Sequence, residues 1–149
     1  MQPIIETYQP DMPASENIWA NLALPIRGSS LFDRIHEGLP ILFLEQLATL
    51  VDIDMRVLST SVGISPSMLS RRAKAGCFTS TESDRLYSLT KVLRAANDLF
   101  EGDTKAVGRW MTTPVRGLGF KAPLAMIDTR VETDALLDLM GRLEHGVSV

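Results

Sequence analysis

The sequence predicts an all-α protein in which a helix-turn-helix unit packs with a smaller helical C-terminal part. Along most of the chain, apolar residues recur at spacings of three and four, the period of a helix that buries one face. The longest such stripe is formed by Leu86, Leu89, Leu93, Ala96 and Phe100. No stretch shows the period-two alternation of a half-buried strand. Hydrophobic residues make up 45% of the chain and charged residues 22%, which is the composition of a globular protein.

The predicted helices begin after an N-terminal arm. Residues 1–29 contain four prolines and show little periodicity, so we expect this arm to be flexible. A short helix that ends at Gly38 follows, with an apolar stripe of Leu31, Phe32 and Ile35. Pro40 suits the first turn of the next helix. The buried face of that helix is predicted to contain Leu42 or Phe43, Leu47, Leu50 and Val51.

Two short helices, over residues 55–62 and 65–75, have the form of a helix-turn-helix. The turn between them needs a residue that accepts positive φ, and Gly63 provides it. Ser65 followed by Pro66 has the form of an N-cap and a first-turn proline, which marks the start of the second helix. Close packing requires a small residue four positions before the glycine, with apolar residues on both sides of the turn. These positions hold Ser59, Leu58, Val62, Ile64 and Leu69.

The remaining elements are predicted to be helical as well. Residues 81–84 resemble a capping box, which predicts the start of the longest helix, ending near Phe100. Asp103 can cap a further helix that ends before Pro114. The chain then continues as a Gly/Pro loop over residues 116–123, a short helix over residues 123–128 and a last helix over residues 129–145.

A cluster of positive charge marks the second helix of the helix-turn-helix. Arg71, Arg72 and Lys74 stand within four residues of one another, although the chain carries a net charge of −3. Such a cluster is either a solvated helix face or a surface that contacts an anion. A solvated face would carry balancing acids, and none occurs between Asp54 and Glu82, so we favour a DNA-reading helix. Its candidate DNA contacts are Ser65, Ser67, Ser70, Arg71, Arg72 and Lys74.

Two of these cations leave alternatives open. Arg71 could read a guanine or grip the phosphate backbone. Arg72 lies further round the helix, so it could contact a phosphate or an acid within the protein. Because three cations give few phosphate contacts, specific binding to operator DNA favours a homodimer on a palindromic site.

No catalytic constellation is present, so we expect no enzyme activity. The chain contains no GxSxG, P-loop or GxGxxG motif. His36 and His145 are too few, together with Cys77, to form a metal site, so we expect neither a metal nor a cofactor. Cys77 stands beside Phe78 and is expected to be a small packing residue. A single cysteine, with no signal peptide and no membrane-spanning apolar run, predicts a cytoplasmic protein without a membrane partner.

An ordered series of residues runs through the C-terminal third of the chain. It comprises Ala96, Leu99-Phe100, Gly102-Asp103, Ala106, Arg109-Trp110-Met111, Pro114, Gly117-Leu118-Gly119, Pro123-Leu124, Asp128-Thr129 and Leu143-Glu144-His145-Gly146. Together with the upstream GISPSMLSRR and residues 82–86, this series resembles antitoxins of the Xre/MbcA/ParS type from RES–Xre pairs. The resemblance implies a DNA-binding domain over residues 30–95, and a toxin-binding domain with a C-terminal tail over residues 96–149.

The resemblance also implies a function. It is that of an antitoxin which binds a RES-type toxin, an enzyme that consumes NAD⁺, blocks its active site and represses the promoter of the pair. A larger heteromeric complex with the toxin is then expected. Exposed positions near the C-terminus are the candidate toxin contacts: Arg116, Lys121, Arg142, Glu144, His145 and Val147. The tail could plug a cleft of the toxin, or it could be a frayed terminus.

The C-terminal part contains more apolar side-chain surface than so short a segment can readily bury, and Trp and Met are suited to interfaces, although each of these residues taken alone is more often a core residue. The residues concerned are Trp110, Met111, Phe120, Met126 and Met140. Two other functions stay open on the residues alone. The chain could be a stand-alone transcriptional regulator whose C-terminal half only dimerises. It could also be a hydrolase or an NAD-binding enzyme, although it lacks the motifs of either.

Overall fold

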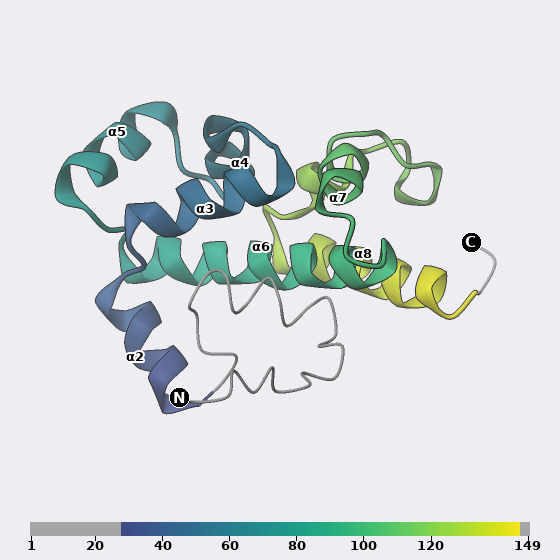
Figure 1. Cartoon of the computed structure of the whole chain (residues 1–149), viewed down its shortest axis with the longest axis horizontal. Coiled ribbons are helices and arrows are strands. Elements are labelled where there is room, and N and C mark those ends of the chain that lie inside the picture. Colours follow the sequence, from purple (N-terminus) through teal and green to yellow (C-terminus); the bar gives the residue numbers. More distant parts are fainter. Residues whose placement is uncertain (1–27, 147–149) are drawn as a thin grey trace, which may run out of the picture.

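The computed structural model describes residues 28–146 (Figure 1). Almost all of the expected N-terminal arm, and Val147 at the other end, lie outside these residues. Within the described range the chain forms α-helices and short 3-10 helices and no strand, which confirms the all-α prediction. In chain order the elements are α2 (Ser29–Glu37), α3 (Ile41–Val51), α4 (Met55–Ser61), α5 (Pro66–Ala75), α6 (Ser80–Leu99), α7 (Thr104–Met111), η1 (Arg116–Leu118), η2 (Pro123–Met126) and α8 (Arg130–Glu144).

The long helix α6 runs through the middle of the molecule, and the other elements are arranged around it (Figure 1). Helices α2, α7 and α8 pack directly on α6, and α3 and α4 lie above α6 in this view, on the same side as α7. The 3-10 helix η2 contacts α4, α7 and α8. Because α4 belongs to the helix-turn-helix and the other two belong to the C-terminal part, η2 joins the two parts.

One continuous hydrophobic core serves both parts of the chain. Leu58 and Ile64 of the helix-turn-helix belong to the same buried cluster as Val107, Met111 and Leu136 of the C-terminal part. A close helix contact adds to this connection, because a Cβ atom at Gly108 of α7 would collide with the carbonyl oxygen of Val51 in α3. The two parts are therefore packed as one body rather than joined by a free linker.

Most helix ends agree with those predicted from capping and turn residues, but the starts of α6 and α3 differ. The capping box of α6 is formed by Thr79 and Glu82 and not by residues 81–84, so the predicted start was two residues late. Glu at the third helical position returns a hydrogen bond to the N-cap backbone, which Asp84 does not do here. Pro40 is the N-cap of α3 rather than its first helical residue.

Tertiary packing decided between several alternatives for which residues are buried. Between the two alternatives for α3, Phe43 is buried and Leu42 is exposed. Met111, Met126 and Met140 lie in the core because α7, η2 and α8 pack together, so for these three residues the core role holds and the apolar surface does not. Trp110 is half-buried, and its ring tilts against that of Phe100 at a centroid distance of 5.9 Å.

Two further residues lie in other surroundings than expected. Cys77 is exposed and is not a packing residue; its backbone instead forms an isolated bridge with Pro40. Phe32 is also exposed, at 62%, while its neighbour Leu31 is buried. Among residues 28–146, no helix combines the length and apolar character that crossing a membrane requires.

Candidate functional site

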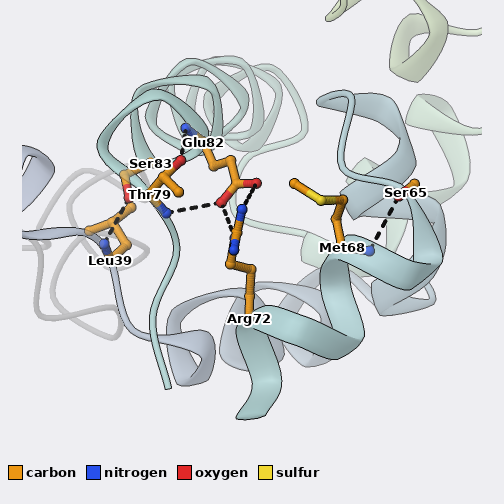
Figure 2. Close-up of polar contacts among 7 residues, drawn as sticks. All are labelled: Leu39, Ser65, Met68, Arg72, Thr79, Glu82 and Ser83. Atoms are coloured by element: carbon orange, nitrogen blue, oxygen red, sulfur yellow. Dashed lines mark hydrogen bonds and ion pairs between the residues drawn. The ribbon is translucent and has the colours of Figure 1, made fainter. Parts of the chain in front are cut away.

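Helices α4 and α5 form the predicted helix-turn-helix. Gly63 lies in the turn with a φ of 79°, and Ser59 is fully buried where the two helices approach. The backbone N–H of Ile64 donates to the carbonyl of Ser59 at 2.9 Å, which closes the turn. Ser65 caps α5 by accepting a hydrogen bond from the backbone N–H of Met68 at 3.2 Å (Figure 2). The four apolar residues predicted to bracket the turn, Leu58, Val62, Ile64 and Leu69, are all buried.

The outer face of α5 is open to solvent. Ser67, Ser70, Arg71 and Lys74 are all exposed, and their spacing of three and four places them along one side of the helix. Within the described part of the chain, neither Arg71 nor Lys74 forms an ion pair. This side of α5 is therefore an accessible ridge that carries two uncompensated positive charges.

The sequence left open whether Arg72 contacts a phosphate or an acid within the protein. In the structure it contacts an acid within the protein. Its Nε lies 2.7 Å from Oε1 of Glu82, and its Nη2 lies 3.2 Å from Oε2 of the same carboxylate (Figure 2). Glu82 is in the first turn of α6 and is 6% exposed. The two-point ion pair therefore fastens the C-terminal half of α5 to the start of the central helix.

The carboxylate of Glu82 accepts hydrogen bonds both from α5 and from the N-cap of α6. Its Oε1 also accepts a hydrogen bond from the backbone N–H of Thr79 at 2.9 Å, and its own N–H donates to Thr79 Oγ1. Burial by itself raises the pKa of Glu82, but the hydrogen bonds from Arg72 and Thr79 and the charge of Arg72 outweigh burial, so the pKa lies below its usual value. The hydrogen bond to Glu82 likewise raises the pKa of Arg72. Both groups stay charged at neutral pH.

The connection between α5 and α6 is tied down on its other side too. The backbone N–H of Leu39 donates to Ser83 Oγ at 2.8 Å (Figure 2), and the N–H of Phe78 donates to the carbonyl of Leu39 at the same distance. The N–H of Ile41 donates to the carbonyl of Gly76. The end of α5 is thus held between the α2–α3 connection and the start of α6.

A second exposed surface lies on the C-terminal part, at the loop between α7 and η2 and at the end of α8. Arg116, Lys121, Arg142, Glu144 and His145 are all exposed. Lys121 Nζ lies 3.6 Å from Glu132 Oε2, and Arg142 pairs with Asp138 along α8 at 3.0 Å. Arg116 forms no ion pair with the described residues.

The structure brings Arg116 close to the end of α8. A hollow of about 470 Å³ is lined by Val115, Arg116, Gly117, Leu139 and Leu143. Arg142, Glu144 and His145 flank Leu143 in sequence, so they stand at this edge of the molecule. Lys121 is placed differently, because its ion pair with Glu132 directs it towards the first turn of α8.

The loop also contains an unusual turn. Gly119 and Phe120 both have a φ of 65°, and the N–H of Lys121 donates to the carbonyl of Leu118 at 3.3 Å. Two successive positive φ values with this bond define a type I′ turn. A non-glycine residue in the left-handed region is less stable by about 1–2 kcal/mol. The side chain of Phe120 is 71% exposed.

No metal centre accompanies these surfaces. Within residues 28–146, no three His, Cys, Asp or Glu side chains are placed so that they could hold one ion.

Two family models match the chain and together cover most of it. Residues 30–91 match the antitoxin Xre-like helix-turn-helix domain, and residues 95–146 match the antitoxin Xre/MbcA/ParS C-terminal toxin-binding domain. An Antitoxin Xre from Yersinia enterocolitica serotype O:8 / biotype 1B is 35% identical over 96% of this chain and 99% of that protein. The chain belongs to the Xre antitoxin family. An Antitoxin Xre from Photorhabdus laumondii subsp. laumondii is 33% identical over 89% of this chain and 91% of that protein.

Membership of the Xre family confirms the resemblance and gives the two surfaces their context. The ridge of α5 lies in the DNA-binding helix-turn-helix, and the loop with Arg116 and Phe120 lies in the toxin-binding domain. The two matched ranges meet within α6, which continues from one into the other. The Xre domains therefore share a helix as well as a core.

Sequence reasoning missed two features of this Xre-family chain. Glu82, as the partner of Arg72, could have been found from the spacing Thr79-x-x-Glu82, since a capping box places its acid at the helix start. Phe120 was expected only as one of five apolar residues, and nothing in the local pattern separates it from the three that are buried. The sequence GF carries no recognised signal for a type I′ turn, which usually has Asn or Gly at the second central position.

Proposed function

We propose that this Xre-family antitoxin binds and occludes a RES-type, NAD-degrading toxin and, as a homodimer, represses its own operon by binding operator DNA through α5. The observation that carries the DNA part is the exposed ridge of Ser67, Ser70, Arg71 and Lys74 on the second helix of a helix-turn-helix. The N-terminal end of α5, capped by Ser65, adds backbone N–H groups and the positive end of the helix dipole. We count Arg72 as a positioning residue, because its guanidinium is already engaged by Glu82.

The charge distribution supports a homodimer. The chain as a whole carries a net charge of −3, so attraction to DNA must come from the ridge itself. With Arg72 engaged, Arg71 and Lys74 provide two phosphate contacts per protomer, for a salt slope of about −2. Two protomers on a palindromic site give a slope of about −4 and read two half-sites. Both the operator and the product of a neighbouring toxin gene would meet the antitoxin in the cytoplasm.

The exposed groups around the α7–η2 loop and the end of α8 support the toxin part. They lie in the matched toxin-binding domain, and they include Arg116, Arg142, Glu144 and His145. Val147, the remaining expected toxin contact, follows this segment in the sequence and lies outside the described residues. The two surfaces belong to different elements, so DNA binding and toxin binding would use different residues.

The proposal is tested with the product of the adjacent gene. We expect the two proteins to co-purify as a heteromeric complex, and we expect the partner alone to consume NAD⁺. Addition of the antitoxin should suppress that NAD⁺ consumption in proportion to the complex formed. If this chain purified as a lone dimer that shifts promoter DNA and left the turnover of the partner unchanged, it would be a stand-alone regulator instead.

A further inference from the structure

We propose that Phe120 is an anchor residue for the toxin, presented in a fixed position by the type I′ turn of residues 118–121. This inference rests on the proposed function, since it assumes that the toxin-binding domain engages a protein partner. It adds a contact that lies outside the C-terminal tail and that was not among the expected toxin contacts.

The conformation of Phe120 is unfavourable for its residue type. The second central position of a type I′ turn is normally taken by Gly or Asn, because positive φ crowds a larger side chain. Asp52 and Glu101 are the other described non-glycine residues with positive φ, and both directly follow a helix or its last turn, where such a residue commonly ends the helix. Phe120 itself follows Gly119, the C-cap of the short 3-10 helix η1, but it is the only one of these three residues with an aromatic side chain.

Packing within the chain does not explain why position 120 holds a phenylalanine. The side chain is 71% exposed, so it contributes little to the core. The hydrogen bonds of the turn come from backbone atoms and would form equally well with Gly or Asn at this position. A large exposed aromatic residue in a strained conformation is therefore a candidate for a role outside the fold.

The turn is held firmly enough to present the ring. The N–H of Val115 donates to the carbonyl of Lys121 at 3.0 Å, and the N–H of Phe120 donates to the carbonyl of Val115 at 3.0 Å. The ion pair of Lys121 with Glu132 then joins the turn to α8. Because the backbone is already ordered, little conformational freedom remains to be lost when a partner binds, and this favours affinity.

The surroundings indicate what kind of partner surface would fit. The same loop carries Arg116, whose charge is not balanced by a described ion pair, and Arg116 and the 37%-exposed Leu143 line the hollow beside it. Aromatic residues and Arg are enriched at interface centres. The toxin should accordingly offer an apolar pocket for the ring of Phe120, with a carboxylate nearby for Arg116.

The test measures folding stability and toxin affinity in the same variants. Phe120→Gly and Phe120→Asn both relieve the unfavourable backbone conformation, and Asn does so without adding the flexibility of Gly. We expect the Tm of each variant to stay unchanged or rise. We expect its affinity for the purified product of the adjacent toxin gene to fall by at least about tenfold. Affinity for operator DNA should stay unchanged.

Phe32→Ala is the matched control. Phe32 is also a largely exposed phenylalanine, but it lies on α2, outside the toxin-binding domain, so its removal should leave toxin affinity unchanged. Wild-type toxin affinity in both Phe120 variants would overturn the anchor role while leaving the antitoxin function intact. Failure of the wild-type protein itself to bind the toxin would overturn the antitoxin function and the anchor role together.

Discussion

Arg72 and Glu82 form a two-point ion pair between α5, the second helix of the helix-turn-helix, and the central helix α6, with an Nε–Oε1 distance of 2.7 Å. Arg72 belongs to a cluster of three cations that look alike in the sequence. In the structure, Arg71 and Lys74 face solvent, whereas Arg72 turns towards the protein. One cluster therefore supplies both the charge of the ridge and the attachment that orients it.

Removal of the Arg72 guanidinium should lower stability and DNA affinity together. In Arg72→Met the apolar stem is retained, but Glu82 remains buried without its partner, which is unfavourable. We expect a lower Tm in thermal unfolding and a weaker operator shift, with toxin binding preserved below the Tm. The double variant Arg72→Met/Glu82→Gln should recover part of the lost Tm, because Gln can still complete the capping box.

Arg71→Ala is the control for this prediction, since Arg71 is exposed and forms no described ion pair. It should weaken the operator shift without changing the Tm. If Arg72→Met left the Tm unchanged as well, the ion pair would not be what holds α5 in place.

The stability of the protein should depend on the protonation of Glu82. Its pKa is lowered in the folded state from the ordinary value of 4.5, so the carboxylate stabilises the fold above pH 4.5, and this contribution is lost as the pH falls through the lower folded-state pKa. We expect the Tm of the wild type to decrease below pH 4.5 more steeply than that of Glu82→Gln. Parallel Tm curves for the two proteins over this range would contradict the role assigned to Glu82.

A methyl group at Gly108 should destabilise both domains at once. In Gly108→Ala, the new Cβ collides with the carbonyl oxygen of Val51, so α7 must move away from α3 at a cost of about 1–3 kcal/mol. Because α3 and α7 belong to different domains that share one core, denaturant unfolding should remain a single transition at a lower midpoint.

Gly141→Ala is the matched control for this change. A Cβ atom at Gly141, in α8, meets no atom within 4 Å, so the substitution should stabilise the protein by about 0.5–1 kcal/mol through its effect on the unfolded chain. Two separate unfolding transitions in Gly108→Ala would show that the domains fold independently.

The ridge of α5 should set the salt dependence of DNA binding. For Lys74→Ala we expect affinity to fall for operator and unrelated DNA alike, and the slope of log K against log salt to become shallower by about 2 per dimer. Fluorescence anisotropy across a salt series measures both quantities. Lys91→Ala, which removes an exposed cation from α6, should leave the slope unchanged.

The helices and the helix-turn-helix could be predicted from the sequence because their signals are local. Ser65-Pro66, Gly63 and the apolar spacing around them act within one or two turns of helix, and the structure places all of them as expected. The cluster of cations could also be predicted, since it depends only on three neighbouring basic residues and on the absence of acidic residues near them in the sequence.

The roles within that cluster were decided by tertiary structure. Arg72 differs from Arg71 because Glu82, ten residues away, is brought opposite it by the turn between α5 and α6. Met111, Met126 and Met140 are buried because α7, η2 and α8 pack together, while Phe120, in a turn with two successive positive φ values, is exposed. Local periodicity determines which segments become helices, but pairing and burial depend on groups that meet only when the chain has folded.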